Sequence, residues 1–149
     1  STWTGIVCSN GYITQFKFFK MGISGSISPV ISNISSLKYI DMSSNSLHGT
    51  LPLSIWNLAS LSHLEIYLNF LTGTLSPSIS KLSNLTYLDL GNNFFEGTLP
   101  YFGDLKKLSL IAMGANMFEG NPFMTVPGIT TITKLAFIDF SSNSFAGKI

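Results

Sequence analysis

The residue types that could carry out chemistry are few in this 149-residue chain. Cys8 is the single cysteine, and His48 and His63 are the two histidines. A lone cysteine could be a nucleophile, but one histidine in a turn and one in a strand make neither an acid–base pair nor a zinc site, which needs three or four convergent ligands. The sequence also has no nucleophile elbow, phosphate-cradling glycine loop or metalloprotease helix. We therefore expect no catalytic residues, no cofactor and no metal.

Composition narrows the possible partners. Charged residues make up 10% of the chain, and eight Lys and Arg against seven Asp and Glu give a net charge of +1. Average soluble proteins carry about 25% charged residues, so this surface offers little to the phosphates of a nucleic acid. Hydrophobic residues make up 45%, enough to bury a continuous core. The charge-free stretch 21–37 is rich in serine and contains glycine and proline, so we expect no transmembrane helix.

An internal repeat organises the chain. Asparagine recurs at intervals of 24, 24, 23 and 27 residues, and glycine follows each asparagine four residues later. The asparagines are Asn45, Asn69, Asn93, Asn116 and Asn143, and the glycines are Gly49, Gly73, Gly97, Gly120 and Gly147. A unit of this length is too short for a domain but long enough for one coil of a solenoid.

The residue pattern within one repeat unit predicts a short strand, a turn and helical turns. The alternation Leu64-x-Ile66 has the period of a short strand, and we expect one strand per unit. Equal coils stack such strands in parallel about 4.8 Å apart. The asparagine follows the strand, where its amide can pair with backbone groups that the turn would bury, and glycine suits a bend without a Cβ. A Leu-Pro-x-x-Ile-x-x-Leu segment predicts short helical turns on the back of the coil.

The repeat Leu-x-x-Leu-x-Leu-x-x-Asn-x-Leu-x-Gly-x-Ile-Pro resembles the plant-type leucine-rich repeat over nearly the whole chain. Residues 13–149 hold about five complete units and a truncated sixth, and residues 1–12 are similar to part of the family's N-terminal cap. The resemblance implies an α/β repeat fold, a right-handed solenoid with a concave parallel β-sheet and short helical turns on the convex side. It also implies a disulfide between Cys8 and a cysteine upstream of Ser1.

The chain departs from the family pattern at several places. Ser28 and Ser76 stand where the family has proline, and a proline follows one residue later in both cases. One residue is missing before Phe102, and the interval 120–135, with Pro122 and Pro127, is longer than the others. We therefore expect the least regular register from Asn93 onward. The chain stops in mid-unit at Ile149, and we expect a fragment of a longer protein.

Outward strand positions form columns when the units are aligned. They read Lys17, Asp41, Glu65, Asp89, Ala112, Asp139; then Gln15, Tyr39, His63, Tyr87, Leu110, Phe137; then Phe19, Ser43, Tyr67, Gly91, Gly114, Ser141. An acidic column beside aromatic rings suits a ligand with basic and apolar groups, such as a peptide. The candidate ligand-binding residues are Tyr39, Asp41, His63, Glu65, Tyr67, Tyr87, Asp89, Phe137 and Asp139. Acidic residues between strand leucines are also frequent in this repeat type, where they can serve only to solvate the sheet.

Two sequons are candidate glycosylation sites, Asn33-Ile34-Ser35 and Asn84-Leu85-Thr86. Asn33 is the better acceptor, because it should face outward on the back of its coil. Asn84 lies close to the next strand, where a glycan would meet a neighbouring coil.

The resemblance implies an extracellular recognition module of a plant receptor-like kinase or receptor-like protein. Its partners would be a peptide or protein ligand, a co-receptor or a cell-wall-derived ligand, at the cell surface, with the full-length protein anchored in the plasma membrane. Two alternatives remain at this point: a secreted inhibitor of cell-wall-degrading enzymes, of the polygalacturonase-inhibiting type, and a truncated product without a ligand.

Overall fold

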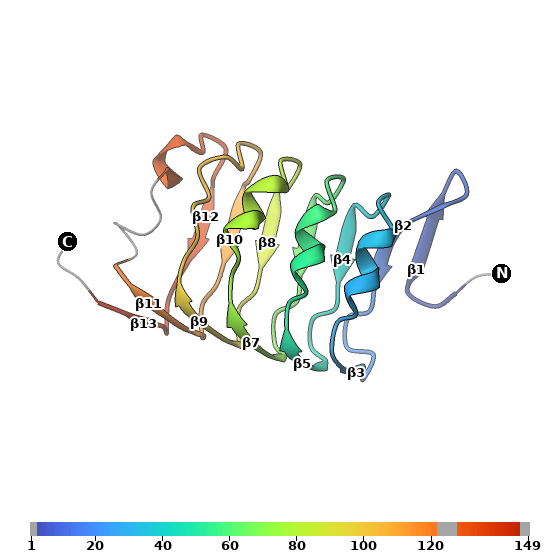
Figure 1. The fold of residues 1–149 in the computed structure, drawn as a ribbon, viewed down its shortest axis with the longest axis horizontal. Coiled ribbons are helices and arrows are strands. Elements are labelled where there is room, and N and C mark those ends of the chain that lie inside the picture. The colour runs from blue at the N-terminus through green and yellow to red at the C-terminus, as the bar shows by residue number, and fades with distance from the viewer. Residues whose placement is uncertain (1–2, 122–127, 147–149) are drawn as a thin grey trace.

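The computed structural model describes residues 3–121 and 128–146, which form one stack of coils running from the N-terminal to the C-terminal end (Figure 1). Among the described residues, a seven-stranded sheet has the order β1-β2-β4-β6-β8-β10-β12. Its strands are β1 (Ile6–Ser9), β2 (Tyr12–Lys17), β4 (Tyr39–Asp41), β6 (His63–Glu65), β8 (Tyr87–Asp89), β10 (Leu110–Ala112) and β12 (Phe137–Asp139). From β2 onward the pairing is parallel, and this first sheet confirms the predicted solenoid.

A second sheet runs along the stack, so the expectation of one strand per unit is wrong. Its strands are β3 (Ser24–Gly25), β5 (Ser46–Thr50), β7 (Phe70–Thr74), β9 (Phe94–Thr98), β11 (Met117–Gly120) and β13 (Ser144–Phe145). From β5 onward each strand begins at the residue after the repeat asparagine and has one apolar residue facing the core, which gives little strand signal in sequence. The two-residue β3 has no such residue. Equal coil lengths bring these segments into register, and His48 consequently lies in β5 rather than in a turn.

The asparagine side chains connect successive coils. Asn69 is buried, and its Nδ2 donates to the carbonyl oxygens of Met42, 3.0 Å away in the preceding coil, and of Ile66, 3.1 Å away in its own turn. Its Oδ1 accepts from Leu47 N at 3.0 Å, again in the preceding coil. The same arrangement occurs at Asn45, Asn93, Asn116 and Asn143. The predicted role of the asparagine amides is confirmed.

Short 3-10 helices lie on the opposite side of the coils from the first sheet (Figure 1). They are η1 (Pro29–Asn33), η2 (Leu53–Asn57), η3 (Pro77–Lys81) and η4 (Ile129–Thr131). The two serine departures are helix caps: Ser28 Oγ accepts from Val30 N and Ser76 Oγ from Ser78 N, with proline at the first helical position. Residues 101–109, which follow the one-residue deletion, form turns without a helix.

The core lies between the two sheets and the helical turns. Leu64, Leu88 and Ile111 are fully buried at equivalent strand positions, and Phe95 and Phe118 stack in the interior with ring centroids 6.2 Å apart. The predicted irregularity after Asn93 does not reach the first sheet, where the columns continue in register to β12. The expected insertion around Pro122 and Pro127, together with Gly147 and Ile149, lies outside the described residues. No helix within the described ranges has the length and apolarity required to cross a membrane.

The N-terminal hairpin covers the first coil. β1 pairs antiparallel with β2 through the turn Asn10-Gly11, where both residues have positive φ, 51° and 81°, as tight hairpin turns require. Gly5 is obligatory, since a Cβ there would come within 2.7 Å of the Lys17 carbonyl oxygen. Cys8 is exposed in β1, and its disulfide to an upstream cysteine stays a prediction, as does the boundary between cap and repeats at residue 12.

Replacing Asn69 by alanine is expected to lower the free energy of unfolding by at least about 2 kcal/mol. The change leaves Leu47 N buried without a partner, at about 1–3 kcal/mol. It also removes one of the two amide hydrogen bonds to each of the carbonyl oxygens of Met42 and Ile66, at about 0.5–1.5 kcal/mol each, while Asn45 and Asn93 still donate to them. Asn69→Asp is expected to be similarly destabilising, because a carboxylate accepts but cannot donate. Urea denaturation measures both variants. Asn57→Ala, at the exposed end of η2, is the control and should stay within about 0.5 kcal/mol of wild type; equal stability of the Asn69 and Asn57 variants would contradict the role of the amide.

Candidate functional site

The outward side chains of the first sheet form one continuous surface, which we call the strand face. Strand pairing aligns Tyr39 with His63 and His63 with Tyr87, and it aligns Asp41, Glu65 and Asp89 in the same way. Ala112 separates Asp89 from Asp139, and Leu110 separates Tyr87 from Phe137. The predicted aromatic and acidic columns therefore lie side by side, as the sequence alignment indicated.

The aromatic column is a stack of rings. The rings of Tyr39 and His63 lie 5.4 Å apart between centroids, and His63 and Tyr87 stack at 5.6 Å with an interplanar angle of 11°. Burial lowers the pKa of His63 below its ordinary value of 6.5, so the imidazole is neutral at neutral pH. Lys17 Nζ lies 5.8 Å from the centroid of the Tyr39 ring and completes this end of the face with a cation–π contact.

The acidic column is partly withdrawn from water. The Tyr39 hydroxyl donates to Glu65 Oε1 at 3.0 Å, and burial together with this carboxylate raises the pKa of Tyr39 to about 12. Burial raises the pKa of Glu65, against the lowering effect of the Tyr39 hydroxyl. Burial also raises the pKa of Asp89, and the nearby charge of Asp139 adds to it, although Gly91 N donates to Asp89 Oδ1 at 3.0 Å. A cation placed beside these carboxylates would therefore stabilise their ionised form.

A hollow of about 310 Å³ opens on the C-terminal half of the strand face. Its walls include Tyr67, Tyr87, Asp89, Leu110, Phe137 and Asp139, and Gly91 and Gly114 lie in its lining. A Cβ on Gly114 would come 2.6 Å from Asp139 Oδ2, and one on Gly91 would come 3.3 Å from Asp89 Oδ1. The glycines therefore leave room for the two aspartates. Asp139 Oδ1 accepts from Ser141 N at 2.9 Å, and the hydrogen bonds from Ser141 lower the pKa of Asp139.

The third predicted column is not the exposed row that the sequence suggested. Ser43, Gly91 and Gly114 are buried, and all of its positions lie beyond the ends of the strands. Phe19 and Tyr67 belong to coils two steps apart, which would separate them by about 10 Å along the stack, yet their ring centroids lie 6.4 Å apart. The rings therefore lean together over Ser43, whose Oγ is buried without a hydrogen-bond partner. Sequence alignment cannot show such leaning, because it assigns each side chain to its own coil.

The two sequon asparagines differ in their surroundings. Asn33 ends η1 and is exposed. Asn84 Nδ2, the atom that a glycan would modify, donates to the Ala59 carbonyl oxygen at 2.9 Å, and Asn84 Oδ1 accepts from Lys107 Nζ at 2.7 Å. The Asn84 side chain therefore bridges the coils before and after it. No such bridge forms at Asn33 among the side-chain hydrogen bonds of the described residues.

The strand face offers carboxylates and aromatic rings that could contact a ligand. Across residues 3–121 and 128–146, no group of three or more His, Cys, Asp and Glu side chains could hold a metal ion. The hollow offers carboxylates beside aromatic rings, the combination that accommodates a basic side chain with an apolar stem.

Comparison with known proteins begins with sequence. The family described as Leucine Rich Repeat matches residues 36–58 and 84–105. The chain is similar to the LRR receptor-like serine/threonine-protein kinase GSO2 of Arabidopsis thaliana, with 40% identity over 53 residues, 36% of this chain and 4% of that protein. The chain thus spans a small part of the curated relative it matches.

Solved structures are similar over more of the chain. The LRR ectodomain of the receptor kinase SOBIR1 from Arabidopsis thaliana has a TM-score of 0.85 and 27% identity, covering 96% of this chain and 84% of that one. The Arabidopsis receptor kinase HAESA, in complex with the peptide hormone IDA and the co-receptor SERK1, has a TM-score of 0.78 and 31% identity, covering 82% of this chain and 20% of that one.

His63 is expected to titrate below pH 6.5, because neighbouring rings bury its imidazole. The folded pKa is lower than that of the unfolded chain, so His63 contributes stability that is present above pH 6.5 and is lost as the pH falls through the folded pKa. NMR titration of the ring carbons measures the midpoint. Tyr87→Ala, which removes the stacked ring, should move the midpoint upward toward 6.5, and an unchanged midpoint would show that the stack does not bury the imidazole.

Proposed function

Because this chain belongs to the leucine-rich-repeat proteins, with repeats of the kind found in plant receptor ectodomains, we propose that its strand face binds an extended peptide. The peptide carries a basic side chain beside an apolar group and occupies the hollow lined by Asp89 and Asp139. The chain acts as an extracellular recognition module, and the full-length protein is anchored at the plant cell surface. Signalling is left to other parts of that protein.

The observation that carries this proposal is the environment of Asp89. Its carboxylate is partly buried beside Tyr87, and its pKa is raised, so its negative charge lacks full solvation. A lysine or arginine of the ligand would offset that cost, and its methylene stem would pack on the rings of Tyr87 and Phe137. Carboxylates placed only to solvate the sheet would instead face water freely.

The relatives support a protein or peptide partner. HAESA is a receptor kinase that was solved with a peptide hormone and a co-receptor, and GSO2 is described as a receptor-like kinase. This chain covers 20% of the HAESA chain and 4% of GSO2, so the identity of its own ligand rests on its own surface. A peptide ligand and a protein co-receptor are accordingly the partners that we propose.

The double variant Tyr87→Ala/Asp89→Asn is expected to weaken peptide binding at least tenfold. Random displayed peptides are selected on the wild-type protein, and calorimetry measures individual peptides on each variant. Loss of a hydrogen bond to a charged group costs about 1.5–3 kcal/mol, which corresponds to roughly 10–100-fold in affinity. Asparagine keeps an oxygen that can accept from Gly91 N, so the fold is preserved.

The matched control is Glu96→Gln, which changes an exposed acidic residue in β9. It should leave the affinity of strand-face peptides within twofold of wild type. The proposal is contradicted if no peptide selected on the wild type is weakened by the double variant, or if the peptides that the double variant weakens are acidic.

In protein secreted from plant cells, Asn33 is expected to carry a glycan more fully than Asn84. The exposed end of η1 gives the transferase access to Asn33, whereas the bridge from Asn84 to Ala59 and Lys107 must open first. Intact mass spectrometry of Asn33→Gln and Asn84→Gln measures the occupancy of each site. A larger loss of mass from Asn84→Gln would contradict the ranking.

A further inference from the structure

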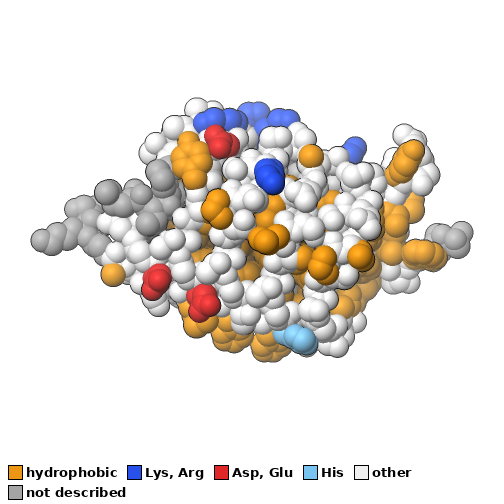
Figure 2. Space-filling view, in the orientation of Figure 1, with side chains coloured by type: hydrophobic (Ala, Val, Ile, Leu, Met, Phe, Trp, Pro, Cys, Tyr) orange, Lys and Arg blue, Asp and Glu red, His pale blue; other side chains and the backbone are white. Residues whose placement is uncertain are grey.

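A row of exposed apolar side chains lies outside the strand face. Leu68, Phe70, Phe94 and Met117 are 52%, 54%, 45% and 45% exposed, and we call them the lateral stripe. Phe70 and Phe94 stack with ring centroids 6.3 Å apart and an interplanar angle of 15°. Figure 2 shows hydrophobic side chains gathered along the lower edge of the molecule, where the strands of the second sheet lie in Figure 1.

The fold does not require apolar residues at these positions. Phe70, Phe94 and Met117 each follow one of the repeat asparagines, and the side chain of the next residue is buried in the core. The equivalent positions in other coils are Ser46 and Ser144, which are exposed and polar. A polar residue is therefore compatible with this position of the coil. Apolar residues at the position in three successive coils expose apolar surface that does not stabilise the isolated chain.

Leu68 is the largest apolar residue at its position in the repeat. Its backbone is left-handed, with φ of 56°, a conformation that an L residue other than glycine, asparagine or aspartate adopts at a cost. The equivalent positions hold Lys20, Ser44, Asn92, Ala115 and Ser142, all of which are smaller or polar. The left-handed backbone at all of these positions belongs to the turn of the repeat, and Leu68 differs in placing a large, exposed apolar side chain there.

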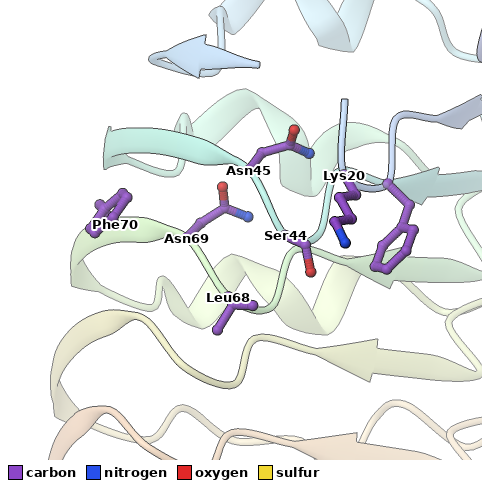
Figure 3. Close-up of a pocket in the computed structure, with 7 residues that line it drawn as sticks. Lys20, Ser44, Asn45, Leu68, Asn69 and Phe70 are labelled. Atoms are coloured by element: carbon purple, nitrogen blue, oxygen red, sulfur yellow. The ribbon is translucent and has the colours of Figure 1, made fainter. Parts of the chain in front are cut away.

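The stripe borders a hollow of about 450 Å³. Lys20 and Leu68 lie on opposite sides of the small Ser44, with Phe70 beyond Asn69 (Figure 3). The hollow exists because Ser44 is smaller than its neighbours in the coils before and after it. Its volume admits one large apolar side chain.

We propose that the lateral stripe is the docking surface for a second protein, distinct from the strand-face ligand. That protein inserts an apolar side chain into the hollow beside Leu68 and Phe70 and sets basic side chains against Glu96 and Glu119. Both glutamates are exposed, and together with Met117 they line a further recess of about 270 Å³ in the second sheet. Acidic side chains also lie beside the apolar edge in Figure 2.

Size and charge favour this occupant over a second copy of the chain. Side chains of this size present about 200 Å² each when fully exposed, so the half-exposed stripe offers roughly 400 Å² of apolar surface, about half of one partner's share of a standard interface. The remainder must be polar. Glu96 and Glu119 are the charges at the Met117 end of the stripe, whereas Lys20 lines the hollow beside Leu68. Lysine side chains lie along the upper edge of the molecule in Figure 2, opposite the apolar lower edge. Lys106 Nζ and Lys107 Nζ donate to Thr131 and Asn84, so in a second copy these two ammonium groups are already engaged.

The test separates this surface from the strand face. Random displayed peptides, which stand in for the contact segment of the partner, are selected on the Tyr87→Ala/Asp89→Asn variant, so that strand-face binders are absent. Selected peptides are expected to combine apolar residues with Lys or Arg and to bind this variant and wild type within twofold. On Phe70→Ser/Phe94→Ser they should lose at least tenfold, and on Glu96→Gln/Glu119→Gln at least threefold. Binding to Leu53→Ser, a control on η2 whose side chain is 72% exposed, should be unchanged.

Thermal unfolding should be unchanged in Phe70→Ser/Phe94→Ser, Glu96→Gln/Glu119→Gln and Leu53→Ser, because the side chains replaced in these variants are exposed. The proposal is overturned when no selected peptide depends on Phe70 and Phe94, or when the dependent peptides are acidic. It is also overturned when light scattering shows a wild-type dimer that Phe70→Ser/Phe94→Ser dissolves, since the occupant would then be a second copy. Failure of the strand-face proposal alone would leave these outcomes intact.

Discussion

Hydrogen bonding by the buried asparagine amides is the constraint on which the rest of the structure depends. At each turn the chain leaves the first sheet and exposes carbonyl oxygens to a dry interior, where an unpaired polar group is costly. One carboxamide satisfies groups in two coils at once, as Asn69 does with Met42, Leu47 and Ile66. Alanine offers no partner and aspartate cannot donate, so only asparagine closes both turns. The same hydrogen bonds consequently hold each coil to the one before it.

That constraint explains why irregular units leave the first sheet undisturbed. The coil after Asn93 is one residue short, and the next is longer. The deletion is absorbed on the convex side, where residues 101–109 form turns in place of a 3-10 helix. Helical turns contact only their neighbours in the stack, so a change of length there costs little, whereas a slip beside Asn116 would unpair several buried groups. The columns of the strand face therefore continue through to Asp139.

The repeat period explains which features could be predicted from the sequence and which could not. Positions tied to the period, such as the core residue Leu88 and the outward Tyr87 and Asp89, follow from alignment alone, because their direction is set by the strand. The second sheet was missed because one apolar residue in a five-residue strand is a weak pattern. The leaning of Phe19 and Tyr67 over Ser43 was missed because it joins coils two steps apart. The hollows depend on small residues at single positions, Gly91, Gly114 and Ser44, whose effect appears only when the larger neighbours are in place.

The buried residues fix the scaffold, so the outward positions are free to vary. Because the chain has few charged residues, the charged side chains at outward positions point to binding surfaces. With 10% charged residues, few side chains compete with the Asp89 and Asp139 pair or with the Glu96 and Glu119 pair for a basic partner. Each pair lies beside apolar side chains, which exclude water and strengthen a charge contact at short range. The rings of Phe19 and Tyr67 lie between the strand face and the hollow beside Leu68, so the two surfaces meet without sharing a carboxylate. A chain arranged in this way can hold two basic, apolar partners at once, because occupation of one acidic pair does not neutralise the other.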